Sequence, residues 1–372
     1  MRKIGIIMTL VSIILIASLL LEACSSATPS TTTSAPAVTT TSPLAASTPA
    51  STKVFNLKFS YHTPERASMV GAYFNPWTDA IEKATNGQVK ITDYPSESLV
   101  KAKDNYDAVV AGLCDIALID TSEYAGRFQQ TEFDVLPYIF PDTAVGAKVY
   151  WDLVQKYAVS KDFKDVVVLG VVVIAPSNYA GNKPAVNLAD FKGMRVRSAG
   201  RAEGWTIEAL GGTPVEVATA DLYTSLERGL VDSAFLSWSL ILRQGVKDVT
   251  KYRTECKLFY RAWPIVMNKS TWDSLGSGLQ QTIMAQSGRD NSAKYCTANE
   301  ALAEEDKAGI AGSDKGAGNP PISTLSAEQT AAWKAAVMPV WDKWANDLEA
   351  NKLPGKAIIA DAKSLVQKYS AK

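Results

Sequence analysis

Two arginines lie at alternate positions near the end of a short apolar segment in the middle of the chain. The segment reads Phe191-Lys-Gly-Met-Arg195-Val-Arg197, and Gly200 interrupts it. Side chains alternate between the two faces of a strand, so Arg195 and Arg197 point to the same face. A buried arginine cannot stay unpaired, so something anionic must meet it. The chemistry that these residues indicate is the recognition of an anion, either a protein carboxylate or a ligand.

The elements around Arg197 decide whether a ligand can reach it. Expected helices and strands alternate here over fewer than fifty residues, which is typical of a parallel sheet with crossover helices. In such a sheet, ligands bind beyond the carboxyl ends of the strands. Arg197 lies near that end and is the first candidate for ligand contact, whereas Arg195 is expected to be structural. The expected order is a strand at 191–197, a helix at 203–210, an apolar run at 215–217, a helix at 221–228 and a strand at 230–236.

One sequence pattern occurs twice, 117 residues apart. In Tyr106–Ala117 and Tyr223–Ala234, Tyr, Gly, Leu, Asp and Ala recur at identical spacing. A helix end, a glycine that closes the helix in a left-handed conformation and a buried strand explain every shared position. The repetition indicates two α/β lobes of related build. Two lobes leave a cleft between them, which is a common place for a small ligand.

Residues at the ends of other expected strands are candidates for the wall of this cleft. Each of them, taken alone, also fits a surface or packing role. The candidates are Tyr61, His62, Asp120, Thr121, Asn178 and Tyr179.

The sequence favours a binding protein over an enzyme. His62 is the only histidine, so a Ser-His-Asp or Cys-His nucleophile system would have to use it. No Gly-x-Ser-x-Gly elbow, phosphate-binding glycine loop or His-Glu-x-x-His helix accompanies it. No pair of cysteines has the spacing of metal ligands. We therefore expect no catalytic residues, no metal and no cofactor.

The N-terminus predicts export. Arg2 and Lys3 precede an unbroken apolar run at 4–21, and the sequence then reads Leu-Glu-Ala-Cys24. This resembles the lipobox of bacterial lipoproteins, although Glu22 is an unusual residue in it. The interpretation is a signal peptide at 1–23 and a lipid on Cys24, with an uncleaved membrane anchor as the alternative. Either interpretation places the rest of the chain outside the cytoplasm.

A tether follows at 24–53. Residues 25–52 are almost entirely Ser, Thr, Ala and Pro, without charge or aromatic side chains, so they cannot bury enough apolar surface to fold. The folded part begins near Val54 and contains about 320 residues, which exceeds a usual single core and favours two domains.

The charge balance limits the partners. Removing residues 1–23 takes Arg2, Lys3 and Glu22 from 38 basic and 38 acidic residues, and leaves 36 and 37. A net charge near −1 argues against nucleic acid as a partner and against a strong electrostatic attachment to lipid.

Three cysteines lie beyond Cys24. Cys114 begins an expected buried strand and is interpreted as a core residue. Cys256 and Cys296 are free to pair in an extracytoplasmic setting, and the sequence does not decide whether they do.

Nine short motifs occur in fixed order: Asn86-Gly87, Tyr94-Pro95, Asp115–Ala117, Leu136–Tyr138, Lys192–Arg197, Gly211–Pro214, Asp221–Tyr223, Gly229–Asp232 and Met267–Asp273. Together they resemble the DctP-like solute receptors of TRAP (tripartite ATP-independent periplasmic) transporters, from about Phe55 to Lys368. The resemblance implies a two-lobed α/β fold of the periplasmic-binding-protein type II, with hinge strands and a long helix that spans both lobes. It also implies capture of an organic anion, usually a carboxylate, and delivery to a membrane permease.

The resemblance also implies where the lobes begin and end. Lobe 1 is expected at 54–174 and 262–303, and lobe 2 at 175–261 and 304–372. The connecting elements are expected at 166–174 (strand), 262–267 (strand), 279–307 (helix) and 309–321 (loop).

In that family, an arginine at the position of Arg197 usually clamps the ligand carboxylate through two parallel hydrogen bonds. Many members carry another arginine before the pair that matches Lys183-Pro184, and many have Asn or a Glu-Asn-Pro run after the strand that matches Ser233 to Phe235. This chain has neither, and reads Phe235-Leu-Ser-Trp238 after that strand. One clamp beside Phe235 and Trp238 indicates a monocarboxylate with an apolar or aromatic body, although both aromatic residues also fit a core role. The open alternatives are an extracytoplasmic enzyme acting on an organic acid and a receptor for a sensor or another transporter type.

The lipoprotein interpretation makes a prediction about Cys24. Cys24→Ser should lose labelled fatty acid, because the thiol that carries the lipid is gone, and the protein should be soluble or remain as its precursor. Cys114→Ala, which changes a cysteine of the folded part, should keep the label. Unchanged fatty-acid incorporation in Cys24→Ser would contradict the lipobox.

Overall fold

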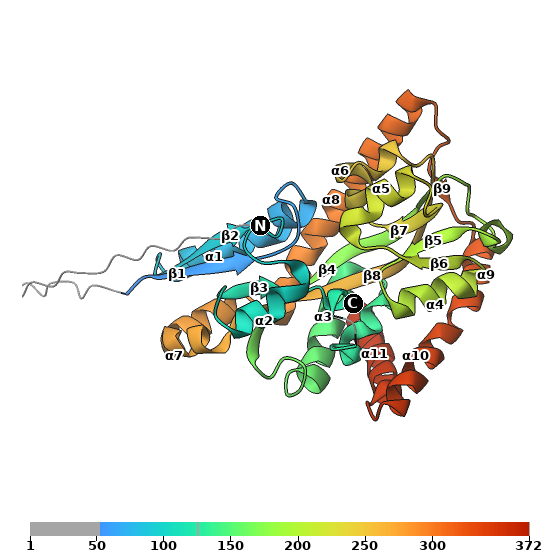
Figure 1. Cartoon of the computed structure of the whole chain (residues 1–372). Helices are drawn as coiled ribbons and strands as arrows, with labels where there is room; N and C mark the ends of the chain where they lie inside the picture. The colour runs from blue at the N-terminus through green and yellow to red at the C-terminus, as the bar shows by residue number, and fades with distance from the viewer. Residues whose placement is uncertain (1–52, 125, 372) are drawn as a thin grey trace, which may run out of the picture. The chain divides into compact units, whose positions relative to one another are not determined.

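The computed structural model describes residues 53–124 and 126–371. In this part of the chain, nine strands form one sheet with helices packed against it (Figure 1). The strand order is β2-β1-β3-β8-β4-β7-β5-β6, and β9 pairs with β8 beside this row. The strands are β1 (Phe55–Ser60), β2 (Val89–Tyr94), β3 (Ile116–Leu118), β4 (Val166–Gly181), β5 (Arg195–Ser198), β6 (Thr213–Glu216), β7 (Ser233–Leu236), β8 (Tyr252–Asn268) and β9 (Ser323–Thr324). The helices are α1 (Asn75–Ala84), α2 (Asn105–Val110), α3 (Thr143–Leu153), α4 (Arg201–Leu210), α5 (Leu222–Glu227), α6 (Trp238–Arg243), α7 (Lys269–Ala285), α8 (Gly288–Ala317), α9 (Ala327–Val337), α10 (Pro339–Ala350) and α11 (Gly355–Ser370).

The sheet consists of two parallel halves joined by two long antiparallel strands. β2, β1 and β3 run parallel in the first half, and β7, β5 and β6 run parallel in the second. β4 and β8, of 16 and 17 residues, pair with each other, while β8 also pairs with β3 and β4 with β7. The first half and the second half are called the first and second lobe below, and β4 and β8 are the hinge strands. This is the two-lobed α/β fold that the sequence predicts.

Both hinge strands are longer than predicted. β4 continues past Ile174 to Gly181 although Pro176 lacks an N–H, because the ladder is irregular between Ile174 and Ser177 and no hydrogen bond from Pro176 is needed. Asn178 lies at the next irregularity, between Ser177 and Tyr179, where its Oδ1 accepts hydrogen bonds from the backbone N–H groups of Cys256 and Lys257, both at 3.1 Å. A buried side-chain amide thus replaces the missing ladder bonds.

The two copies of the repeated pattern have the same local structure. In the first, α2 is followed by Gly112 at φ 75° and then β3; in the second, α5 is followed by Gly229 at φ 67° and then β7. The predicted order of helix, left-handed glycine and strand is therefore confirmed. The repeated leucines, Leu113 and Leu230, are 61% and 53% exposed, so a buried strand does not account for them.

The long helix is displaced from its prediction. α7 ends at Ala285, and the 30-residue α8 then runs from Gly288, at φ 74°, to Ala317. The prediction of a loop at 309–321 is thus wrong for residues 309–317, which belong to α8. Ile310 is fully buried in the core of the second lobe while Cys296 is fully buried in the core of the first, so tertiary packing extends the helix across both lobes.

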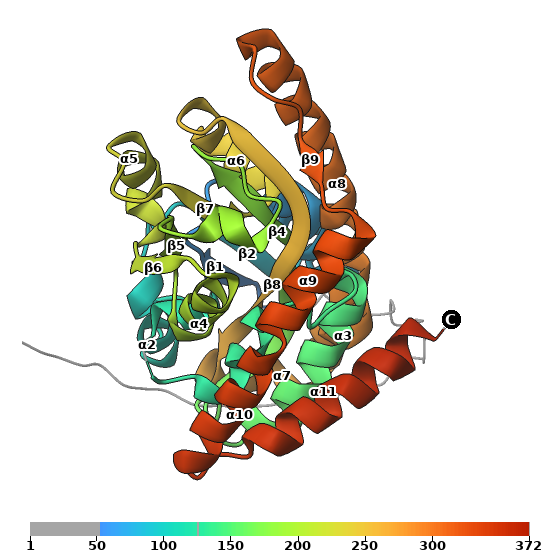
Figure 2. The same ribbon diagram turned by 90° about the vertical axis from the view of Figure 1, so that its right-hand side faces the viewer.

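The C-terminal helices divide between the two cores. Trp333 of α9 packs with the apolar side chains of the second lobe, whereas Trp344 of α10 and Ile358 of α11 belong to the core that includes β1 and β3. α11 packs beside α3 (Figure 2). The predicted lobe boundaries at 54–174 with 262–303 and at 175–261 with 304–372 stay a prediction.

The predicted signal peptide at 1–23, the lipid-bearing Cys24 and the tether up to residue 52 lie outside the described residues. Among the helices that the structure describes, none combines the length and apolar character needed to span a membrane. Cys114, Cys256 and Cys296 are buried and unpaired.

Candidate functional site

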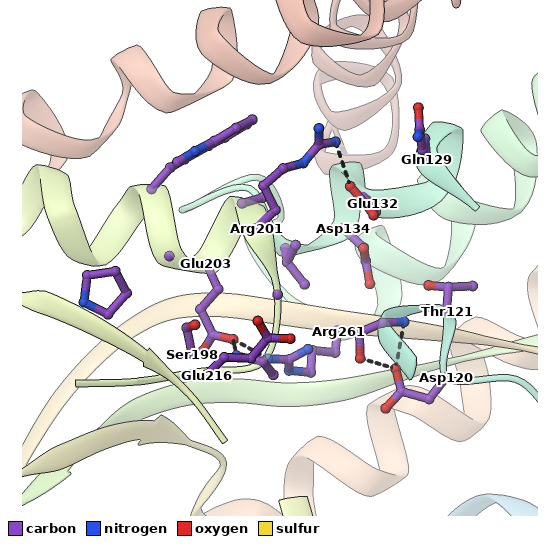
Figure 3. A pocket seen from close by; sticks show the side chains of 18 of the residues that line it. Asp120, Thr121, Gln129, Glu132, Asp134, Ser198, Arg201, Glu203, Glu216 and Arg261 are labelled. Atoms are coloured by element: carbon purple, nitrogen blue, oxygen red, sulfur yellow. Dashed lines mark hydrogen bonds and ion pairs between the residues drawn. The ribbon is translucent and has the colours of Figure 1, made fainter. Parts of the chain in front are cut away.

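A cavity of about 580 Å³ is lined by both lobes and by hinge strand β8. The first lobe contributes residues between 120 and 135, the second lobe residues between 198 and 216, and β8 contributes Arg261 and Trp263. Figure 3 shows that their side chains converge. The charged residues of the lining are Asp120, Glu132, Asp134, Arg201, Glu203, Glu208, Glu216 and Arg261.

Arg197 lies at the end of β5, next to the lining residue Ser198 but not itself in the lining, and 4% of its surface is exposed. Its Nε donates a hydrogen bond to the Val217 carbonyl at 2.9 Å, and a terminal nitrogen donates to the Thr219 hydroxyl at 3.0 Å. It forms no ion pair with any carboxylate that the structure describes. Burial lowers the pKa of the guanidinium, and nearby Glu203 is the strongest influence in the opposite direction. Oriented neutral acceptors hold this cation in place without neutralising it.

The other arginines near the cavity are neutralised. Arg261 donates to Glu203 Oε2 at 2.6 Å. Arg201 pairs with Glu132 at 3.3 Å and also with Asp347. These contacts leave Arg197 as the buried cation at the cavity without a carboxylate partner in the described chain.

Two of the predicted wall residues line the cavity, and a third, His62, lies against the lining residue Trp263. Asp120 and Thr121 line it, and the Asp120 carboxylate accepts hydrogen bonds from the N–H and hydroxyl of Ser122 at 3.1 and 2.5 Å. The His62 ring contacts Trp263 with a centroid distance of 4.7 Å. Burial lowers the pKa of His62, so the ring is neutral at pH 7.

The remaining candidates have packing roles in this conformation. Tyr61 lies in the core of the first lobe; Phe235, Tyr179 and Trp238 lie in the two apolar clusters of the second lobe; and Asn178 fills the hinge irregularity. All five are between 0 and 2% exposed, which leaves no surface for a ligand. Ligand contact by these residues stays a prediction, and the proposal below does not use it.

Sequence reasoning missed most residues of the lining, and four of them are charged or aromatic side chains that matter for the site. Arg261 and Trp263 lie in the hinge strand, Glu203 in the first turn of α4 and Asp134 in a short 3-10 segment. The sequence does contain a signal for Asp134: it is a charged residue within an apolar run, and burying such a residue is costly unless it has a function. The Arg261–Glu203 pair joins residues 58 positions apart and has no local signal.

Asp134 is buried against the hinge. One of its oxygens accepts a hydrogen bond from the Ala262 N–H at 2.7 Å. Burial raises the pKa of Asp134 to about 8; the Ala262 N–H and Arg261 oppose this, and Asp120 and Glu132 add to it. At neutral pH the carboxyl is therefore largely protonated and can donate as well as accept a hydrogen bond.

Two lobes on hinge strands, with a ligand-sized cavity and a buried unneutralised cation between them, define a solute-binding receptor. The chain belongs to the DctP family of bacterial extracellular solute-binding proteins (family 7), whose model matches residues 59–347. It is a receptor of the TRAP transporter class, as the sequence motifs predict.

Relatives and solved structures agree on this family. The chain is 28% identical to the C4-dicarboxylate-binding periplasmic protein DctP of Rhodobacter capsulatus, over 86% of this chain and 95% of that protein. It is similar to a marine metagenome TRAP solute-binding protein specific for aromatic acid ligands (TM-score 0.77, 25% identity, 85% and 99% of the two chains). A TRAP solute-binding protein of Rhodoferax ferrireducens T118, in complex with copurified benzoate, shares the fold (TM-score 0.79, 23% identity, 85% and 99% covered).

The raised pKa of Asp134 predicts how stability depends on pH. Between about pH 4 and 8 the native state holds this proton and the unfolded state does not, so the free energy of unfolding falls as pH rises, by up to about 1.4 kcal/mol per pH unit. Asp134→Asn removes the titration but keeps an oxygen for the Ala262 N–H. Urea unfolding should therefore show the variant gaining stability relative to the parent from pH 5 to pH 8.

The exposed Asp273 supplies the control, and Asp273→Asn should show no such gain. A stability difference between parent and Asp134→Asn that is the same at both pH values would mean that Asp134 is ionised in the fold.

Proposed function

We propose that the chain captures a monocarboxylate with an apolar or aromatic body and delivers it to a TRAP-type membrane permease. The observation that carries this proposal is the buried Arg197 guanidinium, which lacks a carboxylate partner among the described residues. A guanidinium has five N–H donors, and two protein acceptors leave donors free for both oxygens of a ligand carboxylate. A buried cation without an anion is costly, and an incoming carboxylate removes that cost.

The charges around Arg197 favour one carboxylate over two. Arg201 and Arg261 are already paired, so a second ligand carboxylate would find no free buried arginine at the cavity. It would instead meet the Asp120 carboxylate, which disfavours another negative charge. This argues against a dicarboxylate, although the relative in Rhodobacter capsulatus is named for C4-dicarboxylates.

Aromatic side chains favour an apolar body on the ligand. Trp205 and Trp263 both line the cavity and supply broad apolar faces. The similar marine metagenome receptor is described as specific for aromatic acid ligands, which supports the same class here.

The N-terminal sequence supports a membrane-anchored receptor. After removal of residues 1–23, Cys24 would carry the lipid. The tether at 24–53 would then give the folded part a mean reach of about 30 Å if flexible. That reach lets a receptor anchored outside the cytoplasm meet a permease in the same membrane.

The clamp is tested by changing Arg197. A thermal-shift screen of monocarboxylates identifies a ligand, and calorimetric titration then measures its affinity. Arg197→Ala should lose about 2–5 kcal/mol of binding, or about 30-fold to several thousand-fold, because a charge-assisted contact in a closed cleft is removed. Arg197→Lys should recover only part of the loss, since an ammonium cannot present two parallel donors.

Arg195 supplies a matched control on the same strand. It is exposed and pairs with Asp232 at 3.1 Å, so Arg195→Ala should bind like the parent. Unfolding of each variant is recorded beside its titration. A folded Arg197→Ala that binds as tightly as the parent would show that this arginine is structural.

A further inference from the structure

A second cavity, of about 530 Å³, lies against the hinge strands and shares no lining residue with the first. It is lined by the loop before α3, by β8, by the β9–α9 segment and by α11. We call it the hinge groove. The lining residues that matter below are Tyr138, Phe140, Lys257, Tyr260, Leu325 and Lys334.

The hinge groove carries positive charge that the described chain does not neutralise. Lys257 and Lys334 are exposed and form no ion pair with a described carboxylate. Glu255 also lines the groove, but it pairs with Lys307 at 2.8 Å. Two free ammonium groups therefore face a small concave surface.

Tyr138 adds a hydrogen-bond donor to this charge. Its hydroxyl is buried and has no hydrogen-bond partner in the described structure. Burial raises the pKa of Tyr138, so the hydroxyl keeps its proton. The Lys334 Nζ lies 5.1 Å from the centroid of the Tyr138 ring. Buried polar atoms are nearly always satisfied, so this hydroxyl is a donor that the described protein groups leave available to an acceptor.

The rest of the hinge groove is apolar. Phe140, Tyr260 and Leu325 are buried in its wall, and the Tyr260 hydroxyl is already bonded to the Pro141 carbonyl at 3.1 Å. A volume of about 530 Å³ lies within the range of small-molecule sites.

The backbone on both sides of the groove is strained. Tyr138 and Lys257 adopt φ of 57° and 48°, in the left-handed region that side chains other than glycine rarely occupy. The Tyr138 N–H donates to the Leu258 carbonyl at 2.9 Å, which holds the loop on the hinge strand. Such strain gathers at binding sites, where it fixes side chains in position.

We propose that the hinge groove is a second binding site, for a small organic anion with an apolar body. Lys257 and Lys334 meet the charged group together with the Tyr138 hydroxyl, and the partly exposed Tyr138 ring and Val366 contact the body. The site is separate from the cleft beside Arg197, and its occupant touches hinge strand β8 directly.

Calorimetric titration of the full chain with 4-bromobenzoate tests the site. In an Arg197→Ala background the cleft clamp is absent, and one binding event should remain. Adding Lys257→Gln and Lys334→Gln should weaken this event about ten-fold or more, because charge-assisted contacts are lost. Tyr138→Phe, which keeps the ring and removes the donor, should also weaken it.

Lys363 supplies a matched control, because it is exposed and its Nζ lies 5.3 Å from the Trp341 ring centroid. Lys363→Gln should leave the binding event unchanged. If Arg197 is not the clamp, the Arg197→Ala chain should still bind two probe molecules, and adding the lysine changes to it should reduce this to one. The proposal for the cleft and the proposal for the hinge groove therefore fail separately. The hinge groove is overturned if the lysine and tyrosine variants bind as many probes, as tightly, as their background.

Discussion

The buried guanidinium of Arg197 is the charge on which the arrangement of the cleft depends. The Val217 carbonyl and the Thr219 hydroxyl orient the guanidinium without neutralising its charge. In contrast, the charge of the nearby Arg261 is neutralised by its ion pair with Glu203. The fold thus keeps one cation unsatisfied at the place where its two lobes meet. In the function that we propose, an incoming carboxylate would supply the missing partner, and relief of the cost of burying this charge would contribute to the affinity for an anion.

The hinge connects this charge to motion. Glu203 lies in the first turn of α4 and accepts hydrogen bonds from Arg261 on β8 at 2.6 Å and from the Ala199 N–H at 2.8 Å. The second lobe is therefore fixed to the hinge strand close to the clamp, while Asp120 and Thr121 belong to the first lobe. A ligand held by Arg197 and by the first lobe favours the closed form through its contacts on both sides. A receptor needs a difference in shape between its ligand-bound and empty forms if a permease is to distinguish the two.

Local patterns predicted a large part of this structure. Strand alternation and the following glycine placed Arg197 at a strand end, and the repeated pattern predicted two lobes of related build. Local patterns do not predict long-range contacts. The Asn178 amide bonds to β8 where the ladder is irregular between Ser177 and Tyr179, and the burial of Ile310 in the second lobe accompanies the extension of α8 through an expected loop. Aromatic residues were ambiguous for a physical reason, since Phe235 and Trp238 suit a ligand wall and an apolar core equally well. The structure places both in the core.

Native mass spectrometry of the full chain, purified from its own cells without added ligand, tests the central claim most directly. We predict a small acid with a single carboxylate in the cleft, recovered chemically unchanged, and one fewer bound acid per chain in Arg197→Ala prepared in the same way. A co-purified dicarboxylate, or the same acid retained at full occupancy by Arg197→Ala, would contradict a single clamp at Arg197.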